Sequence, residues 1–352
     1  MIEVKKDVVS VWVLQPKIKI DLREIDISNF VDEANSLAKA LPAVKISGST
    51  VVPIERLRPK EFFGAGKVNE LAVTFKSQKI DLVIINYPIS PVQQKNLEQK
   101  WQVKILDRTA LILEIFSDRA VTKEGVLQVE MAALTYQRSR LVRAWTHLER
   151  QRGGLGFVGG PGETQIEADK RAIDLHLVQI KRQLDKIKKT RELHRKSRAK
   201  VPFPIVALVG YTNAGKSTLF NLLTGANEFS ENMLFATLDP KMRAIKLNNK
   251  IQIIISDTVG FISDLPTELI AAFRATLEEV LAADLILHVR DIANKNTDLQ
   301  ALEVEKVLQN LGISQSTPVL EIWNKMDAIE PEKKESLKNI SSRRSGVCYL
   351  SA

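Results

Sequence analysis

The sequence lacks the features that mark secreted, disulfide-stabilised or membrane-spanning proteins. It has one cysteine, Cys348, so no disulfide can form within the chain. It has no run of about 18 apolar residues, as a membrane span requires, and the N-terminal MIEVKKDVV lacks the apolar core of a secretory signal. A hydrophobic content of 44% is typical of soluble globular proteins. Together with these absences it predicts a cytoplasmic protein, which is expected to be a monomer. The four histidines are not spaced as metal ligands: His147, His176, His194 and His288.

The excess positive charge lies in one segment. The formal net charge is +9, and between Leu127 and Lys200 there are 17 Lys and Arg against 8 Asp and Glu, so the rest of the chain is balanced. A basic segment of this kind favours a polyanionic partner, with nucleic acid first. The alternative is a solvated helix face that is basic without a partner.

Residues 1–120 alternate strand and helix patterns, which predicts a small α/β domain with a parallel sheet. A helix is expected after Ser28, with its apolar residues on one face, and another at Ser90-Pro91, because proline is favoured in the first turn. The expected strands are Val8–Leu14, Leu82–Asn86 and Val103–Leu106.

Residues 121–200 are predicted to form an antiparallel hairpin of two long helices, because apolar residues follow a 4–3 spacing on both sides of a glycine-rich break. Arg138 is the one misfit in this seam. The break, residues 153–162, holds six glycines and is expected to be a mobile tip, either a plain connector or a probe that reaches into RNA. The seam residues are Leu127, Met131, Leu134, Leu141, Trp145, Leu148, Ile166, Ile173, Leu177, Ile180, Leu184 and Ile187.

Residues 201–352 are predicted to form a second α/β domain that binds a nucleotide. The apolar strand Pro204–Val209 leads directly into G-x-x-x-x-G-K-S and then a helix, which is the setting of a phosphate-binding P-loop. Lys216 is expected at the β- and γ-phosphates. The phosphate-binding candidates are Gly210, Tyr211, Thr212, Asn213, Ala214, Gly215, Lys216, Ser217, Thr218 and, later in the chain, Gly260.

Two switch segments and a magnesium site are expected after the P-loop. Strands are predicted on either side of Asn248-Asn249, and the second ends in D-T-V-G, where Gly260 N–H can meet the γ-phosphate. The expected Mg²⁺ ligands are Ser217, Thr237 and Asp257. The first switch comprises Phe235, Ala236, Thr237 and Leu238, and the second comprises Asp257, Thr258, Val259, Gly260 and Phe261.

Specificity for guanine is predicted from N-K-M-D after the strand Val319–Trp323. The Asp327 carboxylate can accept hydrogen bonds from the two adjacent donors of guanine, whereas adenine would leave it unpaired. Lys325 can lie over the base, Asn324 can brace the P-loop, and Ser351-Ala352 can address the guanine carbonyl through the backbone.

Together these motifs resemble a translation-factor-class, Ras-like GTPase, and more narrowly the HflX family of the Obg–HflX group. The resemblance covers nearly the whole chain. It rests on Gly210–Phe220 (GYTNAGKSTLF), Phe235–Pro240 (FATLDP), Asp257–Ile262 (DTVGFI), Leu265-Pro266, Ala272–Glu279 (AFRATLEE), Ser90–Glu98 (SPVQQKNLE), Asp107–Leu113 (DRTALIL), Gly125–Glu130 (GVLQVE) and Gly160–Glu167 (GPGETQIE).

The resemblance implies a GTPase, converting GTP to GDP and phosphate with Mg²⁺, that binds the large ribosomal subunit in ribosome splitting, rescue or stress control of translation. It also implies that the N-terminal domain and hairpin reach the RNA near the peptidyl-transferase region. Contacts with RNA are then expected at Arg150, Arg152, Gly153, Gly154, Phe157, Gly160 and Gly162.

Two residues bear on the rate of hydrolysis. Phe261 occupies the position where many GTPases have a water-orienting glutamine, so intrinsic turnover should be slow and stimulated by the ribosome. Asn213 resembles a residue of cation-dependent GTPases and is a candidate K⁺ ligand, or it is a loop residue making a turn bond. Two other functions stay open: an RNA-remodelling enzyme using ATP and GTP, and a non-ribosomal regulatory GTPase with a protein partner.

Overall fold

The computed structural model describes residues 8–18, 27–151, 161–198, 203–226, 234–235, 238, 241–248, 251–263, 279–313 and 317–352. The chain divides into two compact units, and each is mixed α/β. One comprises Met1–Asp118 and Val129–Gln183, and the other comprises Arg119–Gln128 and Leu184–Ala352. Within the described part of the chain, no helix combines the length and hydrophobicity that a bilayer crossing demands.

The first unit contains a four-stranded sheet of order β2-β1-β3-β4, in which every pairing is parallel. The predicted parallel α/β arrangement is therefore confirmed. The strand β2 was not predicted. The strands are β1 (Val9–Ile18), β2 (Val44–Ile54), β3 (Leu82–Ile85) and β4 (Lys104–Asp107), and the helices are α1 (Ile27–Lys39), α2 (Ala65–Ser77), α3 (Pro91–Trp101) and α4 (Arg108–Arg119).

Local sequence explains these elements. All four residues of β3 are buried, as expected of a central strand in a parallel sheet. The helix α3 begins with a capping box, in which Ser90 Oγ accepts from Gln93 N and the Gln93 side chain accepts from Ser90 N. Aromatic rings from α2 and α3 fill the core beneath the sheet, where Phe75 and Trp101 meet edge to face at 5.1 Å.

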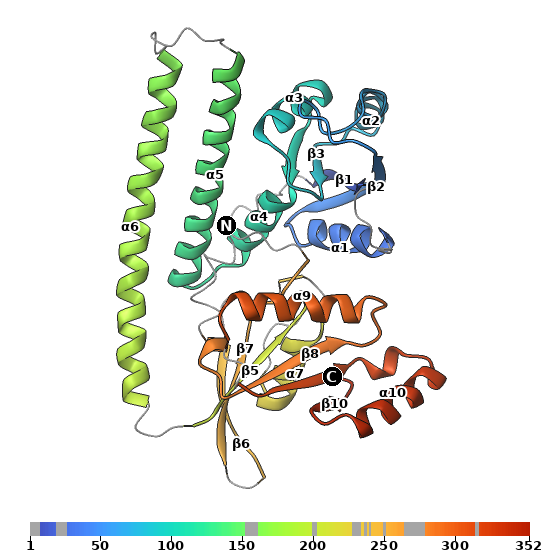
Figure 1. Ribbon diagram of the computed structural model, residues 1–352, viewed down its shortest axis with the longest axis vertical. Coiled ribbons are helices and arrows are strands. Elements are labelled where there is room, and N and C mark those ends of the chain that lie inside the picture. The colour runs from blue at the N-terminus through green and yellow to red at the C-terminus, as the bar shows by residue number, and fades with distance from the viewer. Residues whose placement is uncertain are drawn as a thin grey trace, which may run out of the picture. The chain divides into compact units, whose positions relative to one another are not determined.

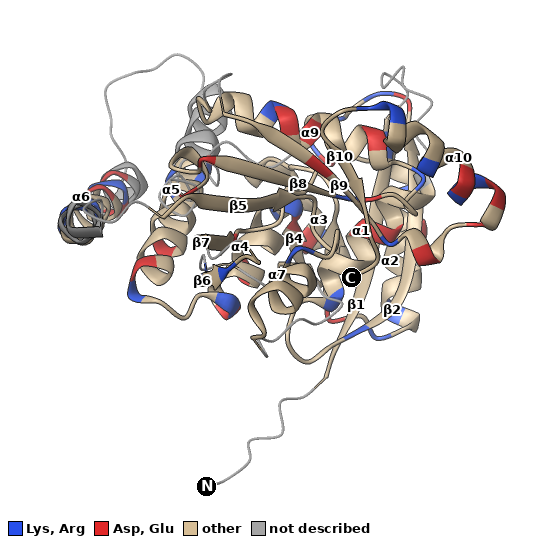
Figure 2. Cartoon of the chain, turned by 90° about the horizontal axis from the view of Figure 1, so that it is seen from below, with Lys and Arg blue, Asp and Glu red and all other residues tan. Residues whose placement is uncertain are grey.

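Two long helices follow, α5 (Lys123–Gln151) and α6 (Pro161–Arg198), and they run antiparallel as predicted (Figure 1). Leu127 and Ile180 of the predicted seam are buried. The misfit Arg138 forms an ion pair with Asp174 of α6 at 2.5 Å, which explains a cation at a seam position. Acidic and basic residues both occur along the described part of α6 (Figure 2).

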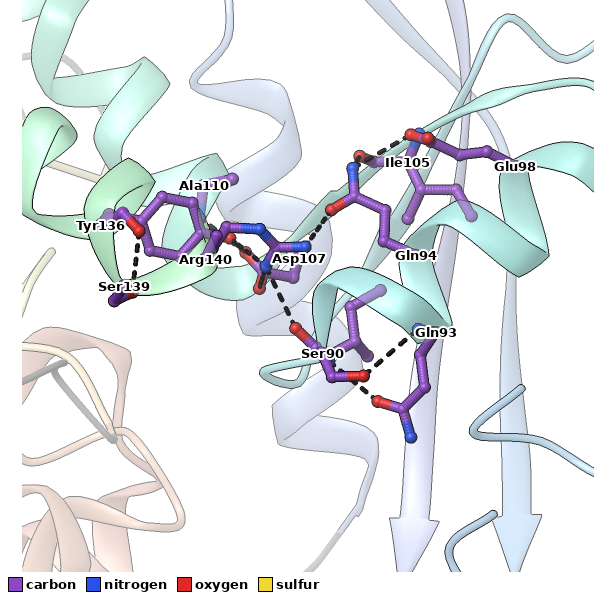
Figure 3. A network of polar contacts seen from close by, with 11 residues as sticks. Ser90, Gln93, Gln94, Glu98, Ile105, Asp107, Ala110, Tyr136, Ser139 and Arg140 are labelled. Carbon is purple, nitrogen blue, oxygen red and sulfur yellow. Dashed lines mark hydrogen bonds and ion pairs between the residues drawn. The ribbon is translucent and has the colours of Figure 1, made fainter. Parts of the chain in front are cut away.

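A polar network fastens α5 to the end of the first sheet (Figure 3). The Asp107 carboxylate accepts from Tyr136 Oη at 2.8 Å and pairs with Arg140 at 3.3 Å. Arg140 also donates to Ile89 O at 3.1 Å and to Gln94 Oε1 at 2.5 Å. Burial and the adjacent Asp107 carboxylate raise the pKa of Tyr136, so this phenol stays protonated and keeps donating.

The second unit is built on a six-stranded sheet of order β10-β9-β8-β5-β7-β6, which is parallel except for β6. The predicted pairing of strands on either side of Asn248 is confirmed by the antiparallel β6 and β7. The elements are β5 (Ile205–Gly210), α7 (Lys216–Thr224), β6 (Lys241–Lys246), β7 (Gln252–Asp257), β8 (Leu285–Asp291), α9 (Thr297–Asn310), β9 (Val319–Asn324), the 3₁₀ turn η1 (Met326–Ala328), α10 (Pro331–Arg343) and β10 (Val347–Tyr349).

The carboxyl ends of the parallel strands β5, β7, β8 and β9 share one edge of this sheet. Ligands of open α/β sheets bind at such an edge, in the crevice outside the strand ends. The sequence motifs expected to bind nucleotide all begin at these ends, because Gly210, Asp257 and Asn324 are the last residues of β5, β7 and β9.

Candidate functional site

The P-loop runs from the end of β5 into the first turn of α7. Two of its glycines are required by their surroundings. A Cβ on Gly210 would lie 2.2 Å from Val289 O, and a Cβ on Gly215 would lie 2.1 Å from Asn324 Nδ2. Gly215 also has φ +95°, a backbone conformation that residues other than glycine rarely adopt. The tight turn therefore leads directly into the N-terminus of α7, and a helix N-terminus preceded by such a turn is a favourable place for a phosphate.

Lys216 is buried, and its ammonium lies inside the loop. Its Nζ donates to Gly210 O at 3.1 Å and to Tyr211 O at 2.8 Å. Burial lowers the pKa of Lys216 to about 8, and the negative charge of Asp257 opposes that effect. Among the described residues, the hydrogen-bond acceptors of this buried cation are carbonyl oxygens, so a phosphate placed beside it would supply a charged partner.

Ser217 and Asp257, two of the expected magnesium ligands, lie side by side. Ser217 Oγ donates to Asp257 Oδ2 at 2.8 Å, and Asp257 is almost completely buried. A hydroxyl and a carboxylate are the hard oxygen donors that Mg²⁺ prefers, so these two residues fit that ion. The third expected ligand, Thr237, and its neighbour Ala236 lie outside the described residues.

The second switch segment is joined to the P-loop by backbone hydrogen bonds. Thr212 N donates to Phe261 O at 2.7 Å, and Phe261 N donates to Gly210 O at 3.1 Å. Gly260 fits between them, because a Cβ there would lie 2.7 Å from Thr212 Cγ2. A contact that the sequence did not predict extends this junction, where Ser263 N donates to the Tyr211 hydroxyl at 2.6 Å. Hydrogen bonds therefore join the P-loop to the second switch segment in this structure.

The other expected switch residues are largely buried. Thr258 Oγ1 donates to Leu208 O at 2.6 Å, which fixes the segment after β7 to β5. Val259, Phe235 and Leu238 have buried side chains, and Phe235 adopts φ 57°.

The N-K-M-D and S-A segments meet the P-loop at the ends of β9 and β10. Asn324 Nδ2 donates to Ala214 O at 2.9 Å, and Asn324 Oδ1 accepts from Ala352 N at 3.0 Å. Ser351 Oγ accepts from Asp327 N at 3.0 Å. Hydrogen bonds from Ser351 and from its own backbone keep the pKa of the Asp327 carboxyl low, so Asp327 carries its charge at neutral pH.

Lys325 is also fixed at this junction. Its backbone is left-handed, with φ 62°, and its Nζ donates to Asn213 O at 2.7 Å and to Asp291 Oδ2 at 2.8 Å. Asn213, the candidate K⁺ ligand, is exposed and has φ 61°. Asp291 was missed from the sequence, although an acid at the end of an apolar strand, as in LILHVRD, is the signal that Asp257 also gave.

The structure describes few of the residues that are expected to contact RNA. Arg152, Gly153, Gly154, Phe157 and Gly160 lie outside the described residues. Arg150 and Gly162 belong to α5 and α6.

Comparisons with known proteins match most of the chain. Family models described as GTP-binding GTPase N-terminal, GTP-binding GTPase Middle Region and 50S ribosome-binding GTPase match residues 28–117, 119–198 and 205–325. The GTPase HflX of Magnetococcus marinus is 48% identical over 90% of this chain and 72% of its own length. That of Escherichia coli is 44% identical over 92% of this chain and 73% of its own length.

The fold also matches a solved structure over most of both chains. The crystal structure of SsGBP in complex with GDP superposes with a TM-score of 0.54, at 24% identity, covering 97% of this chain and 93% of the other. At this identity the likeness supports the fold alone.

Proposed function

Since this chain belongs to the HflX family of GTPases, which bind guanine nucleotide and hydrolyse GTP, we propose that it acts as a nucleotide-controlled switch on the large ribosomal subunit. The finer assignment is ribosome splitting, rescue or control of translation under stress. The nucleotide site is supported by the hydrogen bond from Asn324 Nδ2 to the P-loop carbonyl Ala214 O. This bond joins the phosphate-binding motif to the base-binding motif. The match to a family model described as 50S ribosome-binding GTPase supports the ribosomal partner.

In this proposal, different residues bind the phosphates, the magnesium ion and the base. Lys216 and the P-loop amides would bind the phosphates, and Ser217, Asp257 and Thr237 would hold a magnesium ion, which would supply positive charge beside the phosphates. Asp327 reads the base. Gly260 lies beside Lys216 Nζ, since a Cβ on Gly260 would be 3.1 Å from that atom, so its N–H is close to where the terminal phosphate must be bound.

The same geometry supports slow intrinsic hydrolysis. Phe261 is buried, with both backbone groups bonded to the P-loop, and an apolar ring cannot orient water. The ribosome would then supply or position the missing group. Asn213 is proposed as a K⁺ ligand, and equal GTPase rates in K⁺ and Na⁺ would remove that role.

The basic segment 127–200 supports contact with RNA, including Arg150, Arg152 and the glycine-rich tip. Phosphate contacts release counterions, so binding should weaken steeply with salt.

The experiment is co-sedimentation with purified large subunits in the presence of a non-hydrolysable GTP analogue, GDP or no nucleotide. We expect the tightest binding with the GTP analogue, and loss of that preference in Lys216→Ala. Equal binding in all three conditions would overturn nucleotide control, and no binding in any of them would overturn the ribosomal assignment. Either result would leave the GTPase assignment unaffected. Binding that is insensitive to salt would instead indicate a protein partner.

A further inference from the structure

The Lys325 ammonium is held by two acceptors that come from different parts of the sequence. One is the P-loop carbonyl Asn213 O, at 2.7 Å, and the other is the carboxylate of Asp291, at 2.8 Å. The fractional exposures of the two charged side chains are 29% for Lys325 and 18% for Asp291, so the pair is largely shielded from water. Shielding strengthens a charge-assisted bond relative to an exposed surface pair.

Strand register makes this contact a consequence of the fold. Asp291 is the last residue of β8 and pairs with Asn324, the last residue of β9, so it stands beside the start of N-K-M-D. Ile292 N donates to Asn324 O at 3.1 Å and closes the junction. The two carboxylate oxygens have separate tasks, because Oδ1 accepts from Ala293 N at 3.1 Å while Oδ2 faces Lys325.

We propose that Asp291 is a positioning residue for guanine nucleotide, which acts by fixing the Lys325 side chain where the base binds. The inference rests on the proposed role of Lys325 at the base. A lysine with four rotatable bonds loses substantial conformational freedom when a ligand orders it. A side chain already fixed at both Asn213 and Asp291 has lost that freedom before the nucleotide arrives, so more of its interaction with the base is realised as affinity.

The competing explanation is that Asp291 only stabilises its own turn through Ala293 N. Asp291→Asn separates the two, because the amide keeps an acceptor for Ala293 N and removes the negative charge from Lys325. Without this contact, the nucleotide must order the Lys325 side chain on binding, and that cost is taken from the affinity. We therefore expect the Kd for GDP to rise about tenfold in Asp291→Asn, which corresponds to about 1.4 kcal/mol. The melting temperature of the nucleotide-free protein falls as well, because the pair is present before the nucleotide binds.

A double-mutant cycle tests whether the effect passes through Lys325. GDP binding is measured by fluorescence titration for Asp291→Asn, Lys325→Ala and the double variant, with Asp298→Asn as the matched control on the same unit. The Asp298 side chain is 89% exposed and pairs with Arg290 instead. We expect the Asp291 substitution to have no further effect once Lys325 is alanine, and Asp298→Asn to bind GDP as the unmodified protein does.

Steady-state GTPase kinetics provide the second readout. Loss of a contact that holds the bound nucleotide equally in ground and transition states raises KM and leaves kcat unchanged. A partly unfolded variant would lower kcat at constant KM, and this would overturn the proposal. Asp291→Ser, which keeps an acceptor for Ala293 N, repeats the test if Asp291→Asn does not fold.

The outcomes distinguish the inference from the function on which it rests. Unchanged GDP affinity in Asp291→Asn, or an equal loss in the presence and absence of Lys325, would overturn the positioning role and leave the guanine site intact. Unchanged affinity in Lys325→Ala would remove the guanine assignment of Lys325, and the inference with it.

Discussion

Replacing Asp107 by alanine should loosen the joint between the first sheet and α5, because one carboxylate accepts from three donors there. Asp107 Oδ1 accepts from Ala110 N and from Tyr136 Oη, both at 2.8 Å, and Oδ2 pairs with Arg140 at 3.3 Å. The side chain is 2% exposed. Loss of an N-cap costs about 0.5–2 kcal/mol, and loss of one partner of a buried ion pair costs about 3–5 kcal/mol.

For Asp107→Ala we expect a cost at the lower end of the range for a broken buried ion pair, because Arg140 keeps its hydrogen bonds to Ile89 O and Gln94. We therefore expect Asp107→Ala to lower the free energy of unfolding by about 3 kcal/mol. Asp107→Asn should lower the free energy of unfolding by roughly half as much, because the amide still caps α4 but carries no charge.

The assay is urea unfolding combined with hydrogen exchange, which locates the loss. The Ala110 amide should exchange faster in Asp107→Ala. Exchange along α5 near Tyr136 should also be faster. Glu114→Ala is the control, because Glu114 is an exposed carboxylate on α4, the helix that Asp107 caps. It should change the free energy of unfolding by no more than about 0.5 kcal/mol. A cost below about 1 kcal/mol for Asp107→Ala, or unchanged protection of Ala110, would refute the reasoning.

Three further predictions concern the second unit. Because burial lowers the pKa of Lys216 to about 8, its charge is lost as pH rises through that value, and GDP affinity measured by titration between pH 7 and about 9 should fall; a flat profile would contradict this. Gly215→Ala must displace Asn324, since the new Cβ would lie 2.1 Å from its amide nitrogen, so calorimetry should give at least about tenfold weaker GDP binding; wild-type affinity would refute the bracing role. Burial and the charge of Arg290 lower the pKa of His288 from 6.5 to about 4, so the unfolded chain binds the proton first as pH falls. The free energy of unfolding should drop by up to about 3 kcal/mol across that window, and His288→Gln, followed by urea denaturation, should lack this drop.

That the nucleotide-binding motifs would lie together was predictable, because each motif is contiguous in sequence. G-x-x-x-x-G-K-S, D-T-V-G and N-K-M-D each follow an apolar strand, and parallel strands bring their carboxyl ends to one edge. Asp291 was not predictable in the same way. Its role depends on the register of β8 against β9, which places it beside Asn324 although 33 residues separate them.

The strand β2 was missed because local signals oppose it. VKISGSTVVPI contains Gly48 and Pro53, and both residues are depleted in strands. The structure explains the glycine, since a Cβ on Gly48 would lie 2.5 Å from the ring of Trp12 on the neighbouring strand. The same indole donates to Thr50 Oγ1 at 3.0 Å. The glycine in this strand is therefore explained by a tertiary contact with Trp12, which local propensity does not reveal.

The side chains at the carboxyl ends of the strands differ between the two sheets. This difference bears on whether the first unit also binds a nucleotide. The order β2-β1-β3-β4 reverses direction between β1 and β3, where ligands of such sheets bind. There Asn86 Nδ2 donates to Gln15 Oε1 at 2.6 Å, and Arg108 donates to Asn86 Oδ1 at 2.6 Å and to Glu33 at 2.5 Å. A ligand would have to break these buried bonds, and each bond to a charged group is worth about 1.5–3 kcal/mol. In the second sheet, the strand ends bring the buried Lys216, the start of α7 and the N-K-M-D segment together. Among the described residues, the geometry therefore favours the P-loop as the nucleotide site.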